Sequence, residues 1–458
     1  MIGNLTFLNK NEIETIHESS LSVLEHTGMI IKSPKACKIL AGAGAIVKDS
    51  KVTFPKNLME NILKNIEDDV ELCARDSRYS LHPYKSKVSI NTTNSNSSLV
   101  MPWQGGETRK GTLNDLREFI IVCDYFKEID YFTTIILPSE YPVAYAEIIS
   151  LYESFLHTNK HIQNICTSPL SAQWQIELGA MVAGGKKNLE RNPIFSAQID
   201  PLFSLTMDCN EADTIIALAE NGIPILPYSS PLTGITSPNT IAGTLVLGNA
   251  ELLGILALIK LVNHNGKMIY GADTCAPDLL NGTVNYYAKE YNMFAMANRQ
   301  MADYYGLPSS VAHDCPEGIA KNQQEWNQHY YQVLLNFYVH SDICAWVGCE
   351  ETGFTASLPE VVLAAKFIDQ CKLFDTQQSC FSPGEGSEFI RNYLENNRIE
   401  TPQWIPPRQY VHTGTEVVKK IDQKIERILN THKTEPLEKK LRTEMGFLLE
   451  KAAQKLIK

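Results

Sequence analysis

The stretch from Ile223 to Asp278 constrains the fold more than any other part of the chain. Residues Pro224 to Tyr228 form a short apolar run closed by serine and proline, which is typical of a strand buried on both faces. Residues Ile241 to Val262 are apolar around a whole helix, and Asn265-Gly266 is a stop signal for that helix. A second buried strand follows at Met268 to Tyr270. We therefore predict a β-loop-α-β unit with parallel strands and a right-handed crossover.

The same alternation of apolar runs and helical segments recurs along residues 87–358. It predicts an α/β fold, a (β/α)8 TIM barrel, because the spacings leave room for a loop and a helix after each strand. In such a barrel the chemistry lies in the loops at the carboxyl ends of the strands. The eight candidate strands are Val88–Thr93, Phe132–Leu137, Ile162–Thr167, Ile194–Ile199, Pro224–Tyr228, Met268–Ala272, Ser309–His313 and Ile343–Gly348.

The chain has 458 residues, which suits a barrel of roughly 250 residues with extensions at both ends. We predict an N-terminal helical segment that packs on the barrel, the barrel itself and a C-terminal helical extension, at residues 1–86, 87–358 and 359–458. Thr112 to Asp115 has the pattern of a capping box at the start of a helix. From Glu416 onward two charged amphipathic helices, separated at Pro436, are expected to pack against the barrel or a second subunit. We expect a homo-oligomer.

The charge balance limits the classes of partner. A formal net charge of −11 argues against nucleic acid and is compatible with a cationic substrate. The apolar helix at Ile241–Val262 is interrupted by Asn249, Glu251 and Lys260, so we expect no membrane span. The first residues lack the basic and apolar regions of a signal peptide, which favours a cytoplasmic protein. The 11 cysteines show no pairing pattern and are expected to be buried thiols.

Ordered segments along most of the chain carry a further signal. They are Ile13–Gly28, Leu40–Val47, Val52–Glu60, Glu71–Asp76, Arg109–Phe119, Ser237–Val262, Met268–Gly282, Ala302–Pro308 and Glu350–Ser357. As a set they resemble the trimethylamine methyltransferase family of corrinoid-dependent enzymes, which includes methyltransferases for glycine betaine and related quaternary amines.

The resemblance implies a barrel that binds a methylated amine at the carboxyl ends of its strands, where a separate corrinoid protein docks its reduced cobalt. The trimethylamine enzyme carries pyrrolysine, whereas this chain has standard residues throughout, including Asn322–Asn327. It therefore resembles the non-pyrrolysine branch, whose known substrates are quaternary amines such as betaines. Departures at Asn91–Ser98, Ser309-Ser310 and Ala345-Trp346 leave open which amine is used.

The implied function is transfer of a methyl group from a betaine-type quaternary amine to the cobalt(I) of a corrinoid protein. The corrinoid cofactor would be carried by the partner protein. One alternative is a non-catalytic protein that binds betaine or docks the corrinoid protein. Another is a methyltransferase for a different methylated compound, such as a sulfonium.

Aromatic side chains near strand ends are the first candidates for binding the cation. Methyl displacement removes the positive charge from nitrogen, so full carboxylate charges would hold the ground state better than the transition state. Aromatic faces bind a cation more gently, at roughly 0.5–2 kcal/mol each. The candidates are Trp103, Tyr228, Tyr270, Trp346 and Phe354, with Tyr228 and Trp346 ranked first. For each ring alone, packing in the core is the competing interpretation.

Polar candidates follow the same strands. His313 is the candidate catalytic residue and could orient a carboxylate or hydroxyl of the substrate, while Gln324 could donate to a carboxylate tail. Asp278 and Asn281 are expected to fix a loop. Further acidic residues at strand ends are Asp200, Asp273, Glu350 and Glu351.

Zinc is the main chemical alternative, because corrinoid methyltransferases that act on alcohols and thiols use it. His313-Asp-Cys315 and Cys344-x4-Cys349 could supply ligands, but neither spacing is an established zinc pattern. We expect no metal of the protein's own, since a quaternary amine is already activated.

Overall fold

The computed structural model describes residues 5–66, 70–85, 89–94, 97–201, 204–280, 283–313, 323–375 and 414–457. At its centre is an eight-stranded sheet in the order β4-β16-β15-β12-β11-β9-β8-β7, in which all hydrogen-bonded neighbours are parallel. The strands are β4 Ile90–Thr93, β7 Phe132–Thr133, β8 Ile162–Ile165, β9 Phe195–Ile199, β11 Ile225–Ser229, β12 Tyr270–Ala272, β15 Ser309–Ala312 and β16 Ile343–Val347. Each overlaps one of the eight predicted strands.

Threonine side chains join the first and second strands and so bring the two ends of the sheet together. Thr92 forms a parallel bridge with Tyr131, and its hydroxyl donates to the Tyr131 carbonyl at 3.0 Å. The hydroxyl of Thr93 accepts from the Thr133 backbone N–H at 2.9 Å. The sheet is therefore an almost closed parallel barrel, and the predicted (β/α)8 fold is confirmed.

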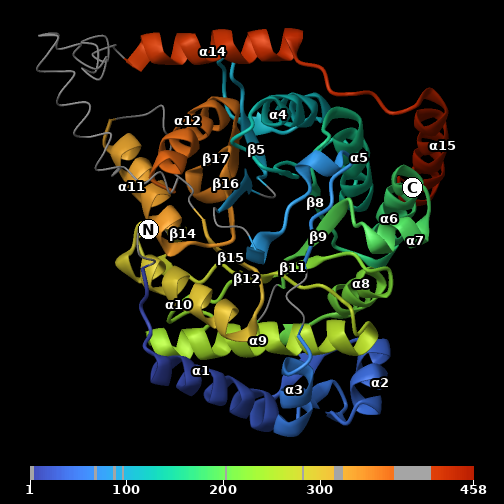
Figure 1. The fold of residues 1–458 in the computed structure, drawn as a ribbon, viewed down its shortest axis with the longest axis vertical. Coiled ribbons are helices and arrows are strands. Elements are labelled where there is room, and N and C mark those ends of the chain that lie inside the picture. Colours follow the sequence, from blue (N-terminus) through green and yellow to red (C-terminus); the bar gives the residue numbers. More distant parts are fainter. Residues whose placement is uncertain are drawn as a thin grey trace, which may run out of the picture.

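Helices surround the strands (Figure 1). They are α4 Leu113–Tyr125, α5 Val143–His157, α6 Pro169–Ala183, α7 Lys186–Arg191, α8 Cys209–Glu220, α9 Ile241–Val262, α10 Lys289–Tyr305, α11 Gln323–Val339 and α12 Leu358–Asp375. The predicted capping box is present at the start of α4, where Thr112 and Asp115 satisfy each other's backbone N–H groups.

Helix α9 has the bounds predicted from its apolar pattern. Thr240 caps its first turn by accepting from the Gly243 N–H. Its length and composition would suit a membrane span, yet 72% of its most apolar window is buried inside the molecule. It lies between the barrel and α1 (Figure 1), so its all-round apolar surface is that of a core helix. The strands on either side of it, β11 and β12, pair in parallel as predicted.

The N-terminal segment contains a small sheet besides its helices. Helices α1 Lys10–Ser22, α2 Pro34–Gly42 and α3 Lys56–Leu63 pack against α9. Strands β1 Met29–Ile31, β2 Ile46–Lys48 and β3 Lys51–Thr53 form an antiparallel sheet. Strand β1 also pairs with β10 Thr206–Met207, which lies in the loop after β9. The segment is therefore tied to the barrel by backbone hydrogen bonds as well as by packing.

The C-terminal helices pack on the chain's own barrel. Helix α14 Gly414–Thr431 lies across α4 and α12, and α15 Lys439–Leu456 lies beside α5 and α6 (Figure 1). The apolar face of α14 buries Ile421, Ile425 and Ile428. Of the two partners expected for these helices, the structure shows the barrel.

Candidate active site

The amino-terminal half of the barrel lumen is filled by apolar side chains. Ile90, Leu226, Ile269 and Ile343 form one cluster there with Val70 and Leu72 from the preceding segment, and the rings of Tyr131 and Tyr228 belong to the same cluster. The His161 ring contacts the Tyr131 ring beside this cluster. Burial lowers the pKa of His161 to about 4, so its ring stays neutral. The open, polar part of the lumen is therefore at the carboxyl ends of the strands, where barrel enzymes place their chemistry.

A chain of hydrogen bonds in the lumen joins three neighbouring parts of the barrel, namely the residue just before β7 and strands β8 and β9. The Tyr131 hydroxyl donates to Gln163 Oε1 at 3.1 Å, and Gln163 Nε2 donates to Gln198 Oε1 at 3.1 Å. Gln198 Nε2 then donates to both carboxylate oxygens of Asp200, at 3.0 and 3.1 Å. An ionised carboxylate only accepts, so Asp200 fixes the orientation of both amides. We call Tyr131, Gln163 and Gln198 the polar chain.

Asp200 lies at the end of the polar chain, one residue beyond β9. Its side chain is accessible to water, yet desolvation by the surrounding protein raises the pKa of its carboxyl to about 6. The hydrogen bond from Gln198 lowers this pKa, the charge of Asp273 raises it, and a positive charge on the His313 ring, when that ring is protonated, lowers it. Asp200, Asp273 and His313 therefore lie close enough to act on one another.

The second carboxylate is held by its own loop. The Asp273 backbone N–H donates to the Ser229 carbonyl at 3.0 Å, which extends the β11–β12 pairing. The Tyr286 hydroxyl donates to Asp273 Oδ2 at 3.0 Å, and the Cys275 thiol lies 3.6 Å from Oδ1. Tyr286 follows the hairpin of β13 Ala276–Asp278 and β14 Thr283–Asn285, so the hairpin and the carboxylate are positioned together.

His313 presents one free ring nitrogen. Its Nδ1 lies 3.0 Å from the Ala345 carbonyl oxygen, which can only accept, so Nδ1 carries the hydrogen. The side chain is 6% exposed, and Nε2 has no hydrogen-bond partner among the residues that the structure describes. In the neutral ring Nε2 is therefore a buried acceptor. Tyr291 holds the His313 backbone, since its hydroxyl accepts from the His313 N–H at 2.6 Å.

Tyr228 is the aromatic wall of this site. Its ring meets the His313 ring edge to face with centroids 5.2 Å apart, and its hydroxyl lies 2.7 Å from Ser310 Oγ. We call Asp200, Tyr228, Asp273 and His313 the lumen cluster. It combines two carboxylates, one aromatic ring and one imidazole acceptor, which together can bind a cation that carries a hydrogen-bonding group.

The structure brings only Tyr228, of the five aromatic candidates, into the lumen. Trp346 is fully buried between the barrel and helices α4 and α12, with its Nε1 donating to Asn91 Oδ1 at 3.3 Å. Tyr270 also faces the helices, where its hydroxyl donates to Asn249 Oδ1 at 2.9 Å. Trp103 Nε1 donates to Glu118 at 2.9 Å, and Phe354 is 58% exposed.

Strand register explains why Tyr228 and Tyr270 face opposite ways. Tyr228 pairs with Gly271, and paired residues of parallel strands point to the same side of a sheet. Tyr270 is one residue out of phase and so faces the helices. A Cβ at Gly271 would lie 2.7 Å from Leu226 Cδ1 and 3.0 Å from Tyr228 Cδ1, so the glycine leaves room for these lumen side chains.

A family model described as trimethylamine methyltransferase (MTTB) matches residues 1–373. The chain belongs to the trimethylamine methyltransferase family. This confirms the family expected from the ordered sequence segments, and the members compared below are named as methyltransferases.

Two relatives in the family are named for different amines. The chain is 27% identical over 361 residues to trimethylamine methyltransferase MttB of Desulfitobacterium hafniense (strain DSM 10664 / DCB-2), covering 78% of this chain and 73% of that protein. It is 26% identical over 318 residues to the glycine betaine methyltransferase of Desulfitobacterium hafniense (strain Y51), covering 68% and 64%. Among solved structures, the Methanosarcina barkeri monomethylamine methyltransferase (MtmB) is similar at a TM-score of 0.48 and 11% identity, over 99% of this chain and 95% of that one.

The remaining predicted site residues lie on or beside the mouth loops. Asp278 Oδ1 accepts from the Leu280 backbone N–H at 2.9 Å, within its own hairpin. Asn281 lies outside the described residues. Gln324 is in the first turn of α11, and its side chain is also outside the described part.

Polar-chain residues are functional candidates that the sequence analysis missed. Gln163 and Gln198 each stand within a short strand that is otherwise mostly apolar, IQNI and FSAQI. A buried amide needs a partner inside the protein, so glutamine inside a parallel-barrel strand is a signal of a polar lumen that could have been used.

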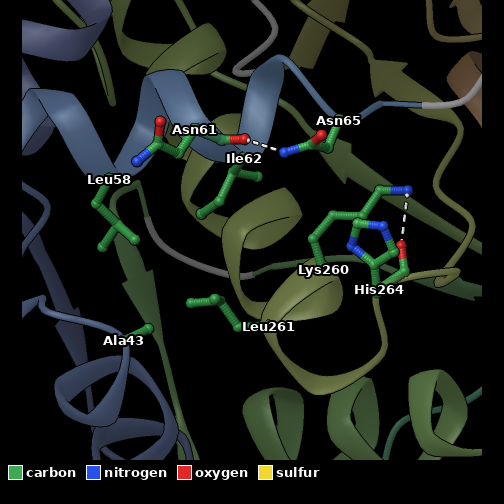
Figure 2. Close-up of a pocket in the computed structure, with 8 residues that line it drawn as sticks. All are labelled: Ala43, Leu58, Asn61, Ile62, Asn65, Lys260, Leu261 and His264. Atoms are coloured by element: carbon green, nitrogen blue, oxygen red, sulfur yellow. Dashed lines mark hydrogen bonds between the residues drawn. The ribbon is translucent and has the colours of Figure 1, made fainter.

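A hollow elsewhere in the molecule is a poor alternative site. It has a volume of about 200 Å³ and lies between α3 and the end of α9 (Figure 2). Its polar groups satisfy one another, since Asn65 donates to the Asn61 carbonyl at 2.8 Å and Lys260 Nζ lies 3.4 Å from the His264 carbonyl. His264 precedes β12, which places this hollow at the amino ends of the strands, away from the lumen cluster.

Proposed function

We propose that the protein transfers a methyl group from a quaternary amine to the cobalt(I) of a separate corrinoid protein. The observation that carries this proposal is the lumen cluster, which offers two carboxylates and an aromatic ring to a cation at the carboxyl ends of the barrel strands. Membership of a methyltransferase family supports it. A cytoplasmic location is part of the same proposal.

The reaction is a displacement at the methyl carbon. The C–N bond breaks and nitrogen keeps its electron pair as a neutral tertiary amine, while the acceptor cobalt(I) supplies both electrons of the new bond and is thereby oxidised to cobalt(III). No general acid is required, so we assign His313 to orientation of the substrate. Positioning at near-attack distance can supply about 7–11 kcal/mol of the barrier.

The two carboxylates help the protein to bind the cation and to release the neutral product. They attract a quaternary ammonium before the reaction and lose that attraction once the amine is neutral, so the product leaves more easily than the substrate. Full carboxylate charges favour the ground state, so they serve binding of the cation and not the chemical step, and the departing methyl group must face the open mouth, where the cobalt approaches. The apolar cluster in the amino-terminal half of the lumen keeps water from entering at that end.

Apolar side chains on the mouth loops support docking of a partner protein. Leu279 and Leu280, at the tip of the β13–β14 hairpin, are 81% and 96% exposed. Ile235 in the loop after β11 and Phe354 after β16 are 59% and 58% exposed. Clustered exposed apolar residues mark interaction sites. Leu232, Cys275, Tyr286 and Cys349 pack these loops together beneath the exposed residues.

Product analysis tests the proposal. The full-length protein is mixed with reduced corrinoid protein and, in turn, glycine betaine, proline betaine, carnitine, butyrobetaine, choline, trimethylamine and a methyl sulfonium. Proton NMR should show one of the quaternary ammonium compounds losing one methyl group as the cobalt is methylated. Leu280→Asp should slow transfer without weakening amine binding, whereas the control Phe447→Asp, a 57% exposed residue on α15, should not.

Two outcomes would contradict the proposal. Binding of an amine without demethylation by any active corrinoid protein would favour the non-catalytic alternative. Demethylation of the sulfonium alone would favour a different methylated substrate.

We further propose that the protein needs no metal of its own. Burial raises the pKa of the Cys344 thiol to about 12, which disfavours the thiolate that zinc binds. Elemental analysis after purification without chelators should find zinc well below one per chain, and chelation should leave methyl transfer unchanged. Stoichiometric zinc together with loss of activity on chelation would contradict this.

A further inference from the structure

The free nitrogen of His313 selects the kind of group that binds to it. Nδ1 donates to the Ala345 carbonyl, so the neutral ring offers an acceptor at Nε2. An acceptor pairs with a donor such as a hydroxyl. A carboxylate has only acceptors and would bind there only if the ring were an imidazolium.

The charges around this nitrogen also disfavour an anionic group. Tyr228, whose ring lies 5.2 Å from the His313 ring, experiences the charges of both Asp200 and Asp273, and these two carboxylates carry like charges. Within the part of the chain that the structure describes, the groups whose charge is felt by Asp200 are Asp273 and His313, and no lysine or arginine is among them. A substrate carboxylate in the lumen would be a third negative charge, while an ammonium group would offset the two that are present.

We infer that the amine bound by the lumen cluster is a hydroxyalkyl quaternary ammonium compound, such as choline, whose hydroxyl donates to His313 Nε2. This inference rests on the proposed function for the nature of the reaction and narrows its substrate class. The ammonium lies between Tyr228 and the carboxylates of Asp200 and Asp273. It departs from the betaine-type substrate that the family resemblance suggests.

Calorimetric measurement of ligand affinity for the full-length protein tests the inference, and no corrinoid protein is needed. The probes separate the groups: choline has the cation and the hydroxyl, tetramethylammonium the cation alone, 3,3-dimethylbutan-1-ol the hydroxyl alone, and glycine betaine the cation with a carboxylate. We expect choline to bind about fivefold more tightly than tetramethylammonium, through one hydrogen bond. It should bind about tenfold or more tightly than glycine betaine, and the neutral alcohol should bind weakest.

A variant of His313 tests whether its ring nitrogen causes the tighter binding of choline than of tetramethylammonium. His313→Phe keeps a ring against Tyr228 and removes Nε2, so the advantage of choline over tetramethylammonium should vanish while tetramethylammonium still binds. His264→Phe, at an exposed histidine of the opposite barrel face, should change neither affinity. Circular dichroism checks the fold of each variant, and if His313→Phe does not fold, the wild-type affinities decide.

Glycine betaine binding as tightly as choline, or choline keeping its advantage in folded His313→Phe, would overturn the inference. Failure of this binding inference can be told apart from failure of the proposed methyl transfer. Choline that binds as expected but is never demethylated contradicts the function and leaves the binding inference standing. Demethylation of glycine betaine with no binding of choline does the reverse.

Discussion

Asp200 makes binding of a cation depend on pH. Its carboxyl has a pKa of about 6, raised chiefly by desolvation, so it is neutral at pH 5 and ionised at pH 7.5. An ionised carboxylate about 5 Å from an ammonium is worth on the order of 1–3 kcal/mol at the mouth of a protein. Affinity for tetramethylammonium should therefore rise by about 3- to 10-fold between these pH values, since the ionised fraction of the carboxyl itself rises only about tenfold. Calorimetry on Asp200→Asn should show no such rise centred near pH 6.

Substitutions at Tyr228 and Trp346 should affect different properties, namely amine binding for Tyr228 and stability of the fold for Trp346. Tyr228→Leu removes the aromatic face of the lumen and should weaken tetramethylammonium binding by about 0.5–2 kcal/mol. Trp346→Leu leaves a cavity between the barrel and its helices and should cost about 2–4 kcal/mol of unfolding free energy, with affinity unchanged in the folded protein. Paired calorimetry and urea unfolding measure both. Weaker binding in Trp346→Leu at full folding would contradict the placement of that ring.

These two residues also show what the sequence can and cannot tell about a site. Polar and aromatic residues near strand ends are readable, and Tyr228, His313, Asp200 and Asp273 were all candidates. Which ring faces the lumen depends on strand register, which a lone sequence does not fix. The polar chain was missed because its bonds join three parts of the barrel, each with unremarkable neighbours in sequence.

Among the elements, helix α6 fits against strand β9 through a glycine. A Cβ on Gly179 would lie 2.6 Å from the Phe195 ring, which is fully buried and cannot withdraw. Gly179→Ala should therefore destabilise the protein by about 1–3 kcal/mol, although alanine favours a helix. Gly446→Ala in α15 meets nothing within 4 Å and should stabilise by about 0.5–1 kcal/mol. Thermal melts compare the two, and equal shifts would contradict this packing.

Element types were predictable where local pattern and burial agree. Helix α9 was found with its bounds because an apolar run of that length, followed by the stop signal Asn265-Gly266, is typical of a buried helix. The barrel strands were found because both of their faces are buried. Strands β1 and β2 were missed, since they are three residues long and depend on pairing with β3 and β10.

At the scale of the whole molecule, the described parts of both extensions pack on the outside of the barrel, and the polar end of the lumen is the place for chemistry. The N-terminal segment covers α9, and α14 and α15 cover the outside of the barrel (Figure 1). The expected homo-oligomer stays a prediction, which sedimentation of the purified protein would test. The mouth loops, with exposed Leu279 and Leu280, provide an apolar surface beside the lumen cluster.

The central claim is that the lumen cluster holds the amine from which the methyl group leaves. The most direct test is single-turnover methylation of the reduced corrinoid protein at pH 7.5 with limiting quaternary amine, for the wild type and Asp200→Asn. We predict methylation of the cobalt by the wild type, and a lower rate for Asp200→Asn that falls by less than its amine affinity does, because the carboxylate favours the ground state. Methylation at the same rate by both proteins, or by neither, would contradict the account.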